Sequence, residues 1–302
     1  MAMKPLWTML AGAGVGGVLT LAAGAAHAAA PCPPGGVVRF GVEPYESTAA
    51  LLPIYNDIGK LIAEKVGCPV KVFITTSYNS EIEAMRAGKL ELAEFGPLGY
   101  VLAHQVADAE AIATFADKNG QPSTYTASIV TWPGSGITTL KGVAGHTFAY
   151  SDPDSTSGHL FPAYALKKAG IDPDHGVRAY YAGTHSESFE AILHHKVEAG
   201  EMNSEQILLA KLQGDYNSKD FVTLWQSNPI PVDPITIYGK LDPAVKARLT
   251  AVMQHLNLEA LPPADLKILG ADGGELVPQT DQAYDGIRDL ISVLHIDLKK
   301  LS

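Results

Sequence analysis

Three successive hydroxyl side chains, Ser155, Thr156 and Ser157, stand between an Asp-Pro turn and an amphipathic segment. One hydroxyl at this position would cap the first free N–H groups of a helix. Three hydroxyls followed by Gly158, which lets a ligand approach the backbone closely, are typical of an anion seat at a helix N-terminus. The triplet by itself leaves both interpretations open, a helix cap and an anion-binding site.

The segment that precedes the triplet favours the anion-binding interpretation. The sequence "HTFAYSDPDSTSG", residues 146–158, reads as a strand that delivers the three hydroxyls to its carboxyl end. Ligands of open α/β sheets bind at the carboxyl ends of strands, in the crevice where the strand order switches. We therefore expect the triplet to face such a crevice.

The chain around the triplet alternates strand-like and helix-like segments. The strand-like stretches "VVRFGV", "VKVFITT" and "LELAEFG" are separated by "TAALLPIYNDIGKLIAEKVG" and "NSEIEAMRAGK", whose apolar spacing is helical. A second alternating series runs from "TYTASIVTW" to "FVTLWQS", and the tail is mostly helical. This order predicts an α/β fold in which each of two lobes is a doubly wound, mostly parallel sheet.

The boundaries of the lobes follow from where the chain would cross between the two series. We expect crossings near Thr126–Val130 and Asn228–Ile235, which would make a clamshell with a two-strand hinge. Lobe 1 would then consist of residues 29–126 and 231–302, and lobe 2 of residues 127–230. A ligand would lie between the lobes.

The N-terminal segment has the features of a secretory signal peptide. Lys4 is its only charge, an apolar run follows, and Ala26-His27-Ala28 is a small-x-small cleavage site. The run is short, rich in Gly and Ala, and has no stop-transfer charges behind it, which disfavours a transmembrane anchor. We expect residues 1–28 to be a signal peptide and the mature protein to be soluble and exported.

The charge balance excludes several classes of partner. Removing Lys4 with the leader leaves 21 of the 22 Lys and Arg residues against 32 Asp and Glu. An acidic chain without a basic cluster is a poor partner for nucleic acid or for an anionic membrane surface. If such a chain binds an anion, it must do so through local dipoles rather than long-range attraction.

Two cysteines in an exported chain indicate one disulfide. Cys32 precedes the strand-like "VVRFGV" and Cys68 precedes "VKVFITT". Neighbouring parallel strands would bring these two starts together, so a bond between Cys32 and Cys68 is possible. Zinc binding or thiol catalysis is a poor fit for so few cysteines at this distance.

No motif in the sequence predicts an enzyme, a metal site or a cofactor. A P-loop, HExxH and a G-x-S-x-G elbow are absent from the sequence. His194 and His195 are adjacent on an expected helix and point in different directions, so they would not share a metal. Ser155 and His185 with an acid could be drawn as a catalytic triad, which keeps a hydrolase as a remote alternative.

Four segments of the chain resemble the phosphonate-binding periplasmic proteins of ABC importers. They are "SYNSEIEAMRAGKLELAEFGPLGYV", "YSDPDSTSGHLFPAYAL", "YYAGTHSESFEAI" and "NPIPVDP". The likeness covers most of the mature chain, and its most specific part is D-P-x-S-T-S-G with a later G-x-H. It implies the two-lobed fold of a periplasmic binding protein (type II-like), no catalytic activity, a periplasmic location and a membrane permease as partner. We also expect a monomer.

The resemblance implies a site for the phosphonate group. The hydroxyls of the triplet would hold the phosphonate oxygens with the help of the helix dipole, and the other donors would come from His185, Tyr78 and Tyr125. Each of these three has a structural alternative. Tyr78 could pack on a surface, Tyr125 could fill a strand, and His185 could be a turn residue bonded to the backbone.

The resemblance also implies a site for an ammonium group, because family members that bind 2-aminoethylphosphonate grip it with two carboxylates. Glu205 and Asp233 fall at the corresponding places, although Glu also begins surface helices and Asp-Pro also forms turns. Glu198 and Glu201 lie near Glu205 in sequence and are expected to make this end more acidic than the family pattern requires.

The preferred ligand is therefore 2-aminoethylphosphonate, and the alternative is a receptor for phosphite, phosphate or another oxyanion that feeds a transporter or a sensor kinase. Pro162 lies inside the helix that is expected after the triplet and should kink it, because proline removes a backbone donor.

Overall fold

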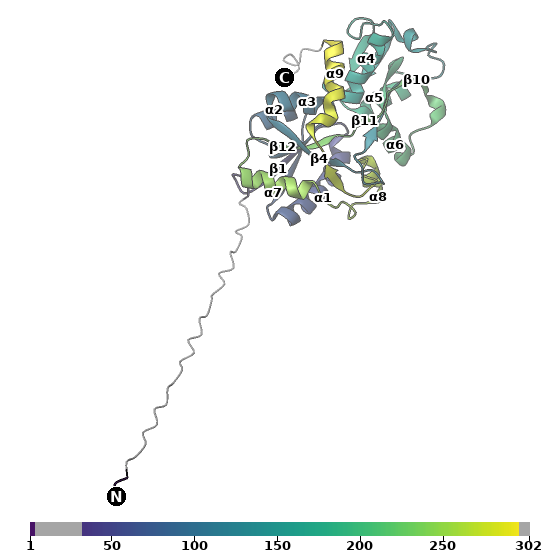
Figure 1. The fold of residues 1–302 in the computed structure, drawn as a ribbon. Helices are drawn as coiled ribbons and strands as arrows, with labels where there is room; N and C mark the ends of the chain where they lie inside the picture. Colours follow the sequence, from purple (N-terminus) through teal and green to yellow (C-terminus); the bar gives the residue numbers. More distant parts are fainter. Residues whose placement is uncertain (4–31, 296–302) are drawn as a thin grey trace.

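The structure is a computed structural model that describes residues 1–3 and 32–295. The predicted signal peptide, residues 1–28, therefore lies outside the described residues except for its first three. Figure 1 shows two α/β lobes, with α2 and α3 in one lobe and α4 and α5 in the other. None of the helices in the described ranges has the length and hydropathy needed to span a lipid bilayer.

The first lobe is built on a six-stranded sheet. The chain enters it with β1, whose Val38, Phe40 and Val42 side chains are fully buried in the larger of the hydrophobic cores. Across the sheet the strands lie in the order β13 (Leu276–Pro278), β4 (Ala109–Phe115), β12 (Pro234–Tyr238), β3 (Leu92–Glu94), β1 (Val38–Val42) and β2 (Val70–Ile74).

The second lobe is built on a five-stranded sheet with a hydrophobic core on each face, one around Phe148 and the other around Phe189. Its strands lie in the order β10 (Val222–Gln226), β6 (Ala127–Thr131), β9 (Ala199–Asn203), β7 (Thr147–Tyr150) and β8 (Arg178–Tyr181).

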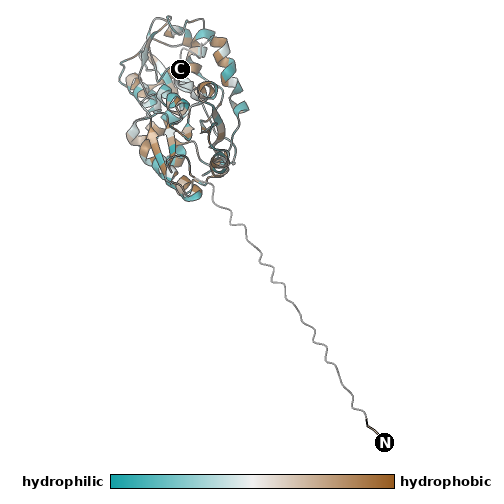
Figure 2. Cartoon of the chain, turned by 90° about the vertical axis from the view of Figure 1, so that its left-hand side faces the viewer, coloured by the Kyte–Doolittle hydropathy of each residue, from teal (hydrophilic) through white to brown (hydrophobic). Residues whose placement is uncertain are grey.

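Helices cover both sheets, and in Figure 2 hydrophobic and hydrophilic residues alternate along them, as expected for helices with one buried face. Helices α1, α3 and α7 pack against the first sheet, and α4, α5 and α6 pack against the second. The helices are α1 (Thr48–Val66), α2 (Tyr78–Arg86), α3 (Pro97–Val106), α4 (Phe161–Lys168), α5 (His185–Leu193), α6 (Ser204–Gln213), α7 (Pro243–Met253), α8 (Pro263–Ile268) and α9 (Asp285–Leu294).

Local sequence signals fix several of these helix ends. The Ser47 hydroxyl accepts a hydrogen bond from Ala50 N at the start of α1, and Gly67 ends the helix in the left-handed conformation at φ 62°. At the start of α2, Ser77 and Ser80 form a reciprocal capping box. These caps place the first turn of α2, which begins with Tyr78, at the carboxyl end of β2.

The two lobes are connected by a pair of short antiparallel strands, β5 (Thr124–Tyr125) and β11 (Ile230–Pro231). Each of them is followed at once by a strand that enters a lobe, β6 after β5 and β12 after β11. Figure 1 shows β11 at the junction of the lobes. The C-terminal helix α9 packs on α3 of the first lobe and on α4 of the second.

The α/β class and the two-lobed arrangement are as predicted, but the expected mostly parallel pairing is wrong. In the first sheet β1 pairs in parallel with β2 and β3, whereas β12 is antiparallel to both β3 and β4. In the second sheet β6 is antiparallel to β9 and β10. A parallel neighbour needs a crossover connection, usually a helix. Strands β6 and β12 enter straight from the hinge without one, so both sheets are mixed.

The structure joins Cys32 and Cys68 in a disulfide. Strand β1 is parallel to β2 with Val38 opposite Val70, so the two cysteines precede neighbouring strand starts. The bond ties the first residues of the described domain to the edge strand of the first sheet.

The helix after the hydroxyl triplet changes type where a kink was expected. Residues Thr156–Leu160 form a π-helical turn, and the α-helix proper, α4, begins at Phe161 with Pro162 in its first turn. A proline is tolerated there because the N–H groups of a first turn have no intrahelical acceptor. The expected kink at Pro162 is therefore replaced by a change from π- to α-helical winding.

Candidate ligand-binding site

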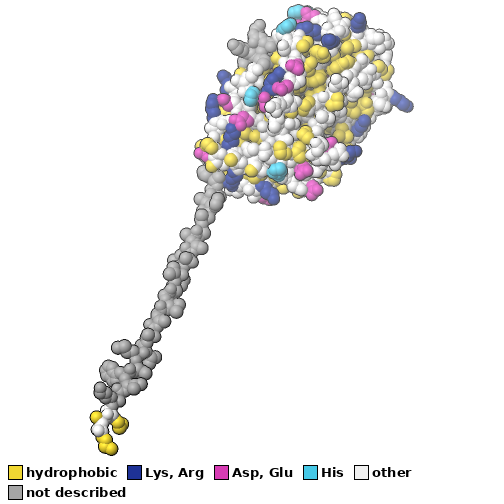
Figure 3. All heavy atoms as spheres, viewed as in Figure 1, with side chains coloured by type: hydrophobic (Ala, Val, Ile, Leu, Met, Phe, Trp, Pro, Cys, Tyr) yellow, Lys and Arg dark blue, Asp and Glu magenta, His cyan; other side chains and the backbone are white. Residues whose placement is uncertain are grey.

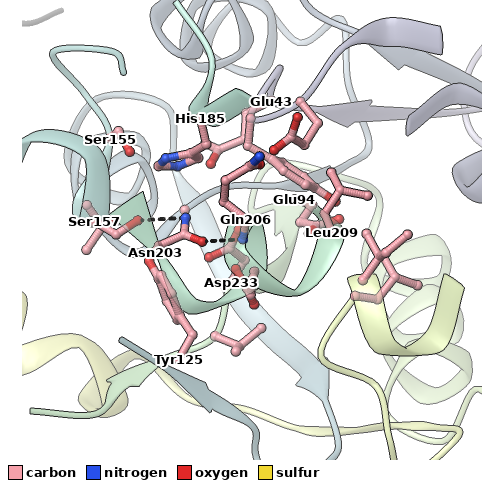
Figure 4. A pocket seen from close by; sticks show the side chains of 18 of the residues that line it. Glu43, Glu94, Tyr125, Ser155, Ser157, His185, Asn203, Gln206, Leu209 and Asp233 are labelled. Carbon is pink, nitrogen blue, oxygen red and sulfur yellow. Dashed lines mark hydrogen bonds between the residues drawn. The ribbon is translucent and has the colours of Figure 1, made fainter. Parts of the chain in front are cut away.

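A pocket lies between the two lobes at the carboxyl ends of β1, β3 and β7. Its residues come from both sheets, from the starts of α2, α5 and α6, and from the segment that enters β12. All eight residues that the sequence analysis assigned to ligand binding line this pocket: Tyr78, Tyr125, Ser155, Thr156, Ser157, His185, Glu205 and Asp233. The structure thus brings the predicted set together, and Figure 4 shows several of its members around one space.

The three hydroxyls of the triplet have three different roles. Ser155 is the cap, because its Oγ accepts a hydrogen bond from Gly158 N at 3.1 Å. The Thr156 Oγ1 accepts a hydrogen bond from Leu98 N of the other lobe at 2.8 Å. The Ser157 Oγ accepts one from the Asn203 side-chain amide at 3.3 Å (Figure 4). The cap and the anion-seat interpretations are therefore compatible, since one hydroxyl is enough for the cap.

Gly158 is required here by close approach rather than by backbone conformation. A Cβ atom at this position would lie 1.7 Å from Ser151 Oγ and 2.8 Å from Ser155 Oγ. The start of the π-helical turn consequently packs directly onto the end of β7, which aims the hydroxyls and N–H groups of residues 155–157 at the pocket.

Two phenols stand beside these hydroxyls. Tyr78 and Tyr125 are buried, and burial together with nearby carboxyl groups raises the pKa of each phenol well above its ordinary value. Both phenols therefore stay protonated and can donate. The Tyr78 hydroxyl has no hydrogen-bond partner among the residues that the structure describes, so it is available to a ligand oxygen.

His185 is held in the wall of the pocket by Glu201. The Nδ1 atom of His185 lies 2.9 Å from Glu201 Oε1, and both side chains are buried. Burial disfavours the charged imidazolium, but the Glu201 carboxylate outweighs it and raises the pKa of His185 to about 9. The imidazole is therefore protonated at neutral pH and presents Nε2–H as a donor.

Glu198 and Glu201 do not add charge to the pocket, contrary to the expectation from their place in the sequence. Glu201 is the partner of His185, and Glu198 accepts hydrogen bonds from the backbone and the hydroxyl of Thr147 at the start of β7. Neither residue lines the pocket. Glu198 precedes β9 and Glu201 lies within it, whereas Glu205 is in the first turn of α6.

Three other acids line the pocket and were missed by the sequence analysis: Glu43, Glu46 and Glu94. Each is buried. Glu43 directly follows β1 and Glu94 ends β3, so both stand at carboxyl ends of strands. The rule that located the triplet would have identified these two positions. Glu46 lies in the loop before α1, where the sequence carries no comparable signal.

The polar residues Tyr45, Asn203 and Gln206 were also missed. The Asn203 Oδ1 caps α6 by accepting a hydrogen bond from Gln206 N at 2.7 Å, and its amide points to Ser157 (Figure 4). The Tyr45 hydroxyl lies 2.9 Å from the Tyr55 hydroxyl. An Asn before a helix is a common cap signal, but sequence alone does not tell which caps also face a pocket.

Burial raises the pKa of the acids in the pocket and so disfavours their ionised forms. Burial, followed by repulsion from Asp233, raises the pKa of Glu205 to about 8. Burial raises the pKa of Asp233 to about 7, with the opposing effect of His185, and it raises that of Glu46 to about 7. Burial and the Asp233 carboxyl also raise the pKa of Glu43 and of Glu94 well above the ordinary value.

Polar contacts join the lobes around the pocket. Besides the bond from Leu98 N to Thr156, the backbone N–H of His185 donates to Tyr45 O at 3.1 Å. The Ser186 hydroxyl also donates to the Glu46 carboxylate. The lobes are therefore in contact across the pocket, in a closed arrangement.

The pocket combines hydroxyl, phenol and imidazole donors with five acids. Figure 4 shows Ser155 and Ser157 on the opposite side from Glu94. Neither a Lys nor an Arg is found among the described residues that line the pocket. Within residues 1–3 and 32–295 there is also no cluster of three or more His, Cys, Asp or Glu side chains that could hold a metal ion. The pocket is suited to a small ligand with an anionic and a cationic end.

Comparison with known proteins identifies the family. Residues 40–284 match the family described as ABC transporter, phosphonate, periplasmic substrate-binding protein. The phosphate-import protein PhnD of Mycolicibacterium smegmatis is 27% identical over 276 residues, which cover 85% of this chain and 85% of that protein. The phosphonates-binding periplasmic protein of Escherichia coli is 28% identical over 217 residues, covering 70% of this chain and 64% of that protein.

Solved structures show the same fold. A binding-protein component of an ABC phosphonate transporter from Pseudomonas aeruginosa superposes with a TM-score of 0.75 at 24% identity, covering 86% of each chain. PhnD1 of Prochlorococcus marinus in complex with methylphosphonate gives a TM-score of 0.74 at 19% identity, covering 86% of this chain and 98% of that one.

The family consists of substrate-binding proteins of ABC transporters rather than enzymes, which decides against the hydrolase alternative. Its members are periplasmic and work with a membrane permease. With the family match spanning residues 40–284 and the two-lobed fold in agreement, this chain belongs to the periplasmic phosphonate-binding proteins of ABC transporters.

Proposed function

We propose that this protein binds 2-aminoethylphosphonate between its lobes and delivers it to the permease of an ABC importer. The observation that carries the proposal is the presence of both anion donors and five acids in one buried pocket that no Lys or Arg of the described residues lines. A phosphonate without a cationic arm would leave the acids of that pocket unpaired, which is unfavourable in a buried site.

The phosphonate group would be bound by neutral donors and one imidazolium. The donors are the hydroxyls and N–H groups of the triplet, the two phenols and the His185 ring, which are Ser155, Thr156, Ser157, Tyr78, Tyr125 and His185. The N-terminus of the helix that follows the triplet adds its dipole. Glu205 and Asp233 would bind the ammonium group.

The two lobes would close on the ligand as two bodies joined by a hinge. We propose residues 29–126 with 231–302 as one lobe and residues 127–230 as the other, joined by β5 and β11. The mature protein would act as a monomer, because one copy supplies every residue that lines the pocket.

The oxyanion alternative has one observation in its favour, since the relative from Mycolicibacterium smegmatis is named a phosphate-import protein. The acids of the pocket disfavour phosphate, because phosphate has no cationic group that could pair with them. The five acids are Glu43, Glu46, Glu94, Glu205 and Asp233.

Calorimetric titration of the mature protein with 2-aminoethylphosphonate, methylphosphonate, phosphite and phosphate tests the proposal. We expect the amino compound to bind at least about tenfold more tightly than methylphosphonate, since one paired buried charge contributes more than 1.4 kcal/mol. Tighter binding of phosphate or phosphite than of the amino compound would replace the proposal by the oxyanion alternative.

A further inference from the structure

A third carboxyl group, that of Glu94, faces the same part of the pocket as Glu205 and Asp233. We infer that Glu94 is the third carboxylate at the cationic end of the ligand, and that the three acids together select a primary ammonium group over N-methylated amines. This inference rests on the proposed function, because it concerns the amine that the proposed ligand carries.

The position of Glu94 is fixed by the central strands of the first sheet. Glu94 ends β3 and pairs with Ile235 of β12, two residues after Asp233. Because β12 runs antiparallel to β3, its first residues lie beside the last residues of β3. Glu205 comes to the same wall from the first turn of α6 in the other lobe. Three different elements thus supply the three acids.

The Glu94 side chain has an unused acceptor. Glu94 is 2% exposed, and its Oε2 has no hydrogen-bond partner among the residues that the structure describes. The neighbouring Tyr55 hydroxyl interacts with the carboxyl group and is itself bonded to Tyr45. A buried carboxyl oxygen without a donor is destabilising. A donor on the ligand would satisfy Oε2.

A primary ammonium group has enough donors for all three of these acids. A primary ammonium group presents three N–H donors, and Glu94, Glu205 and Asp233 present one carboxyl group each. Each N-methyl group would replace one donor and leave one buried acid unpaired. A trimethylammonium group would leave all three unpaired.

Proton release from these acids on ligand binding is a second measurement that tests the inference, besides affinity. Burial, followed by repulsion from Asp233, raises the pKa of Glu205 to about 8, and burial raises that of Asp233 to about 7. Burial and repulsion from Asp233 and Glu205 raise the pKa of Glu94 well above its ordinary value. An ammonium group favours the ionised carboxylates and so lowers these pKa values. Near pH 7 its binding therefore releases protons to the buffer, and its affinity should rise as the pH increases through 7 to 8.

Other titratable groups face this wall and are part of the same balance. They are Glu43 after β1, Glu46 in the loop before α1, His185 at the start of α5, and the phenols of Tyr45, Tyr55 and Tyr125. The phenols stay protonated throughout this range because burial raises their pKa. Comparison of a ligand with its methylated form at one pH cancels the contributions that the two complexes share.

The test is calorimetry of the wild-type protein and of Glu94→Gln, each in two buffers of different ionisation enthalpy at pH 7. The ligands are 2-aminoethylphosphonate, its N-methyl and N,N,N-trimethyl derivatives, and methylphosphonate. In the wild type we expect each unpaired acid to weaken binding about 10- to 100-fold. Glu94→Gln should lose most of the preference for the primary amine, release fewer protons, and bind methylphosphonate at least as tightly as the wild type does.

Glu81→Gln is the matched control. Glu81 lies on α2, is also fully buried, and interacts with Glu94, but it does not line the pocket. The control should keep the wild-type preference among the four ligands. Methylphosphonate binding and the melting temperature report whether each variant is folded, and the wild-type series with methylated amines tests the inference without any variant.

The possible failures are distinguishable. Equal binding of the primary and the trimethylated amine by the wild type would overturn the inference and leave the proposed function standing. The same holds if Glu94→Gln weakens all four ligands equally, because Glu94 would then be structural. If the wild type binds 2-aminoethylphosphonate no better than methylphosphonate, the proposed function fails and the inference fails with it.

Discussion

At the scale of single residues, the three hydroxyls of the triplet have different partners, and that of Ser157 is the one we expect to bind the ligand. Ser155 caps the turn and Thr156 binds the other lobe through Leu98. We expect Ser157→Ala to weaken phosphonate binding by about 1.5–3 kcal/mol, the usual contribution of a hydrogen bond to a charged group. Calorimetry with 2-aminoethylphosphonate measures the loss.

The control for that variant is its stability. Because the cap belongs to Ser155, the melting temperature of Ser157→Ala should stay within a few degrees of the wild type. Ser155→Ala should lose stability as well as affinity, since it removes the cap. Unchanged affinity in a folded Ser157→Ala protein would return the triplet to a purely structural role.

A second residue-scale prediction concerns Gly96, the residue before α3. Its φ of −60° is open to any residue, but a Cβ atom there would lie 2.7 Å from Glu43 Oε1. Gly96→Ala should therefore displace the buried Glu43 carboxyl and lower the free energy of unfolding by about 1–3 kcal/mol. Denaturant unfolding measures the change.

Gly99→Ala is the matched comparison, on the same helix and facing the same carboxyl group. A Cβ atom at Gly99 would have Glu43 Oε2 as its nearest neighbour at 3.4 Å, an ordinary contact. It should be tolerated, or even be stabilising through its higher helix propensity. Equal effects of the two substitutions would show that contact with Glu43 does not decide them.

Residue types at strand ends limited what could be predicted about the site. The triplet, the His of "AGTH" and the Asp of "PVDP" carry recognisable motifs, and the structure places all three in the pocket. Glu43 and Glu94 stand at the carboxyl ends of strands, where the rule that located the triplet also applies, but no motif marks them. The position of the Glu46 side chain involves a contact with Ser186 of the other lobe. Such a contact between residues far apart in the sequence is not visible in a local pattern.

At the scale of elements, strands and helices were predictable where their patterns are local. The strand-like segments before α1 and α2 and the helix that ends on Gly67 form as expected. Strand direction is not local. The antiparallel entry of β6 and β12 follows from the hinge, and so does the mixed character of both sheets. The π-helical turn after Ser155 packs through Gly158 against Ser151, the residue after β7, which is a tertiary contact.

The disulfide gives an element-scale prediction. Cys32 and Cys68 are 36 residues apart and tie the starts of β1 and β2. Replacing both by Ala should lower the free energy of unfolding by about 2–4 kcal/mol, because the unfolded chain regains the freedom of that loop. Thermal unfolding of the double variant measures the loss, and a reducing agent should lower the melting temperature of the wild type alone.

Ligand binding should be unaffected by the same double substitution. The bond joins the starts of the strands, whereas the pocket residue Glu43 follows the other end of β1. A strand of five residues separates the two by about 16 Å. Loss of affinity in the folded double variant would mean that the disulfide positions the pocket and does more than stabilise the lobe.

At the scale of the whole molecule, the surface and the site carry different electrostatics. On the face drawn in Figure 3, Lys and Arg side chains are mixed with Asp and Glu side chains. On this face the mixed charges produce no field of one sign that would select a ligand, so we expect specificity to come from the pocket. The pocket in turn exists only when the lobes meet, because its anion-binding hydroxyls and most of its acids lie on different lobes.

The last prediction is that ligand closes the molecule. The hinge consists of two strands of two residues each, so little structure resists bending there. Few polar contacts join the lobes at the pocket: Leu98 to Thr156, His185 to Tyr45 and Ser186 to Glu46. They surround several acids that have no Lys or Arg partner among the described residues of the pocket. Ligand would satisfy those acids and bridge the lobes, which favours the closed form by its differential affinity. Small-angle scattering of the mature protein should therefore give a smaller radius of gyration with saturating 2-aminoethylphosphonate than without it. Inorganic sulfate at the same ionic strength is the control and should leave the radius unchanged. Identical profiles with and without the amino compound, at a concentration that calorimetry shows to be saturating, would mean that the lobes are closed before ligand binds and that closure contributes nothing to recognition.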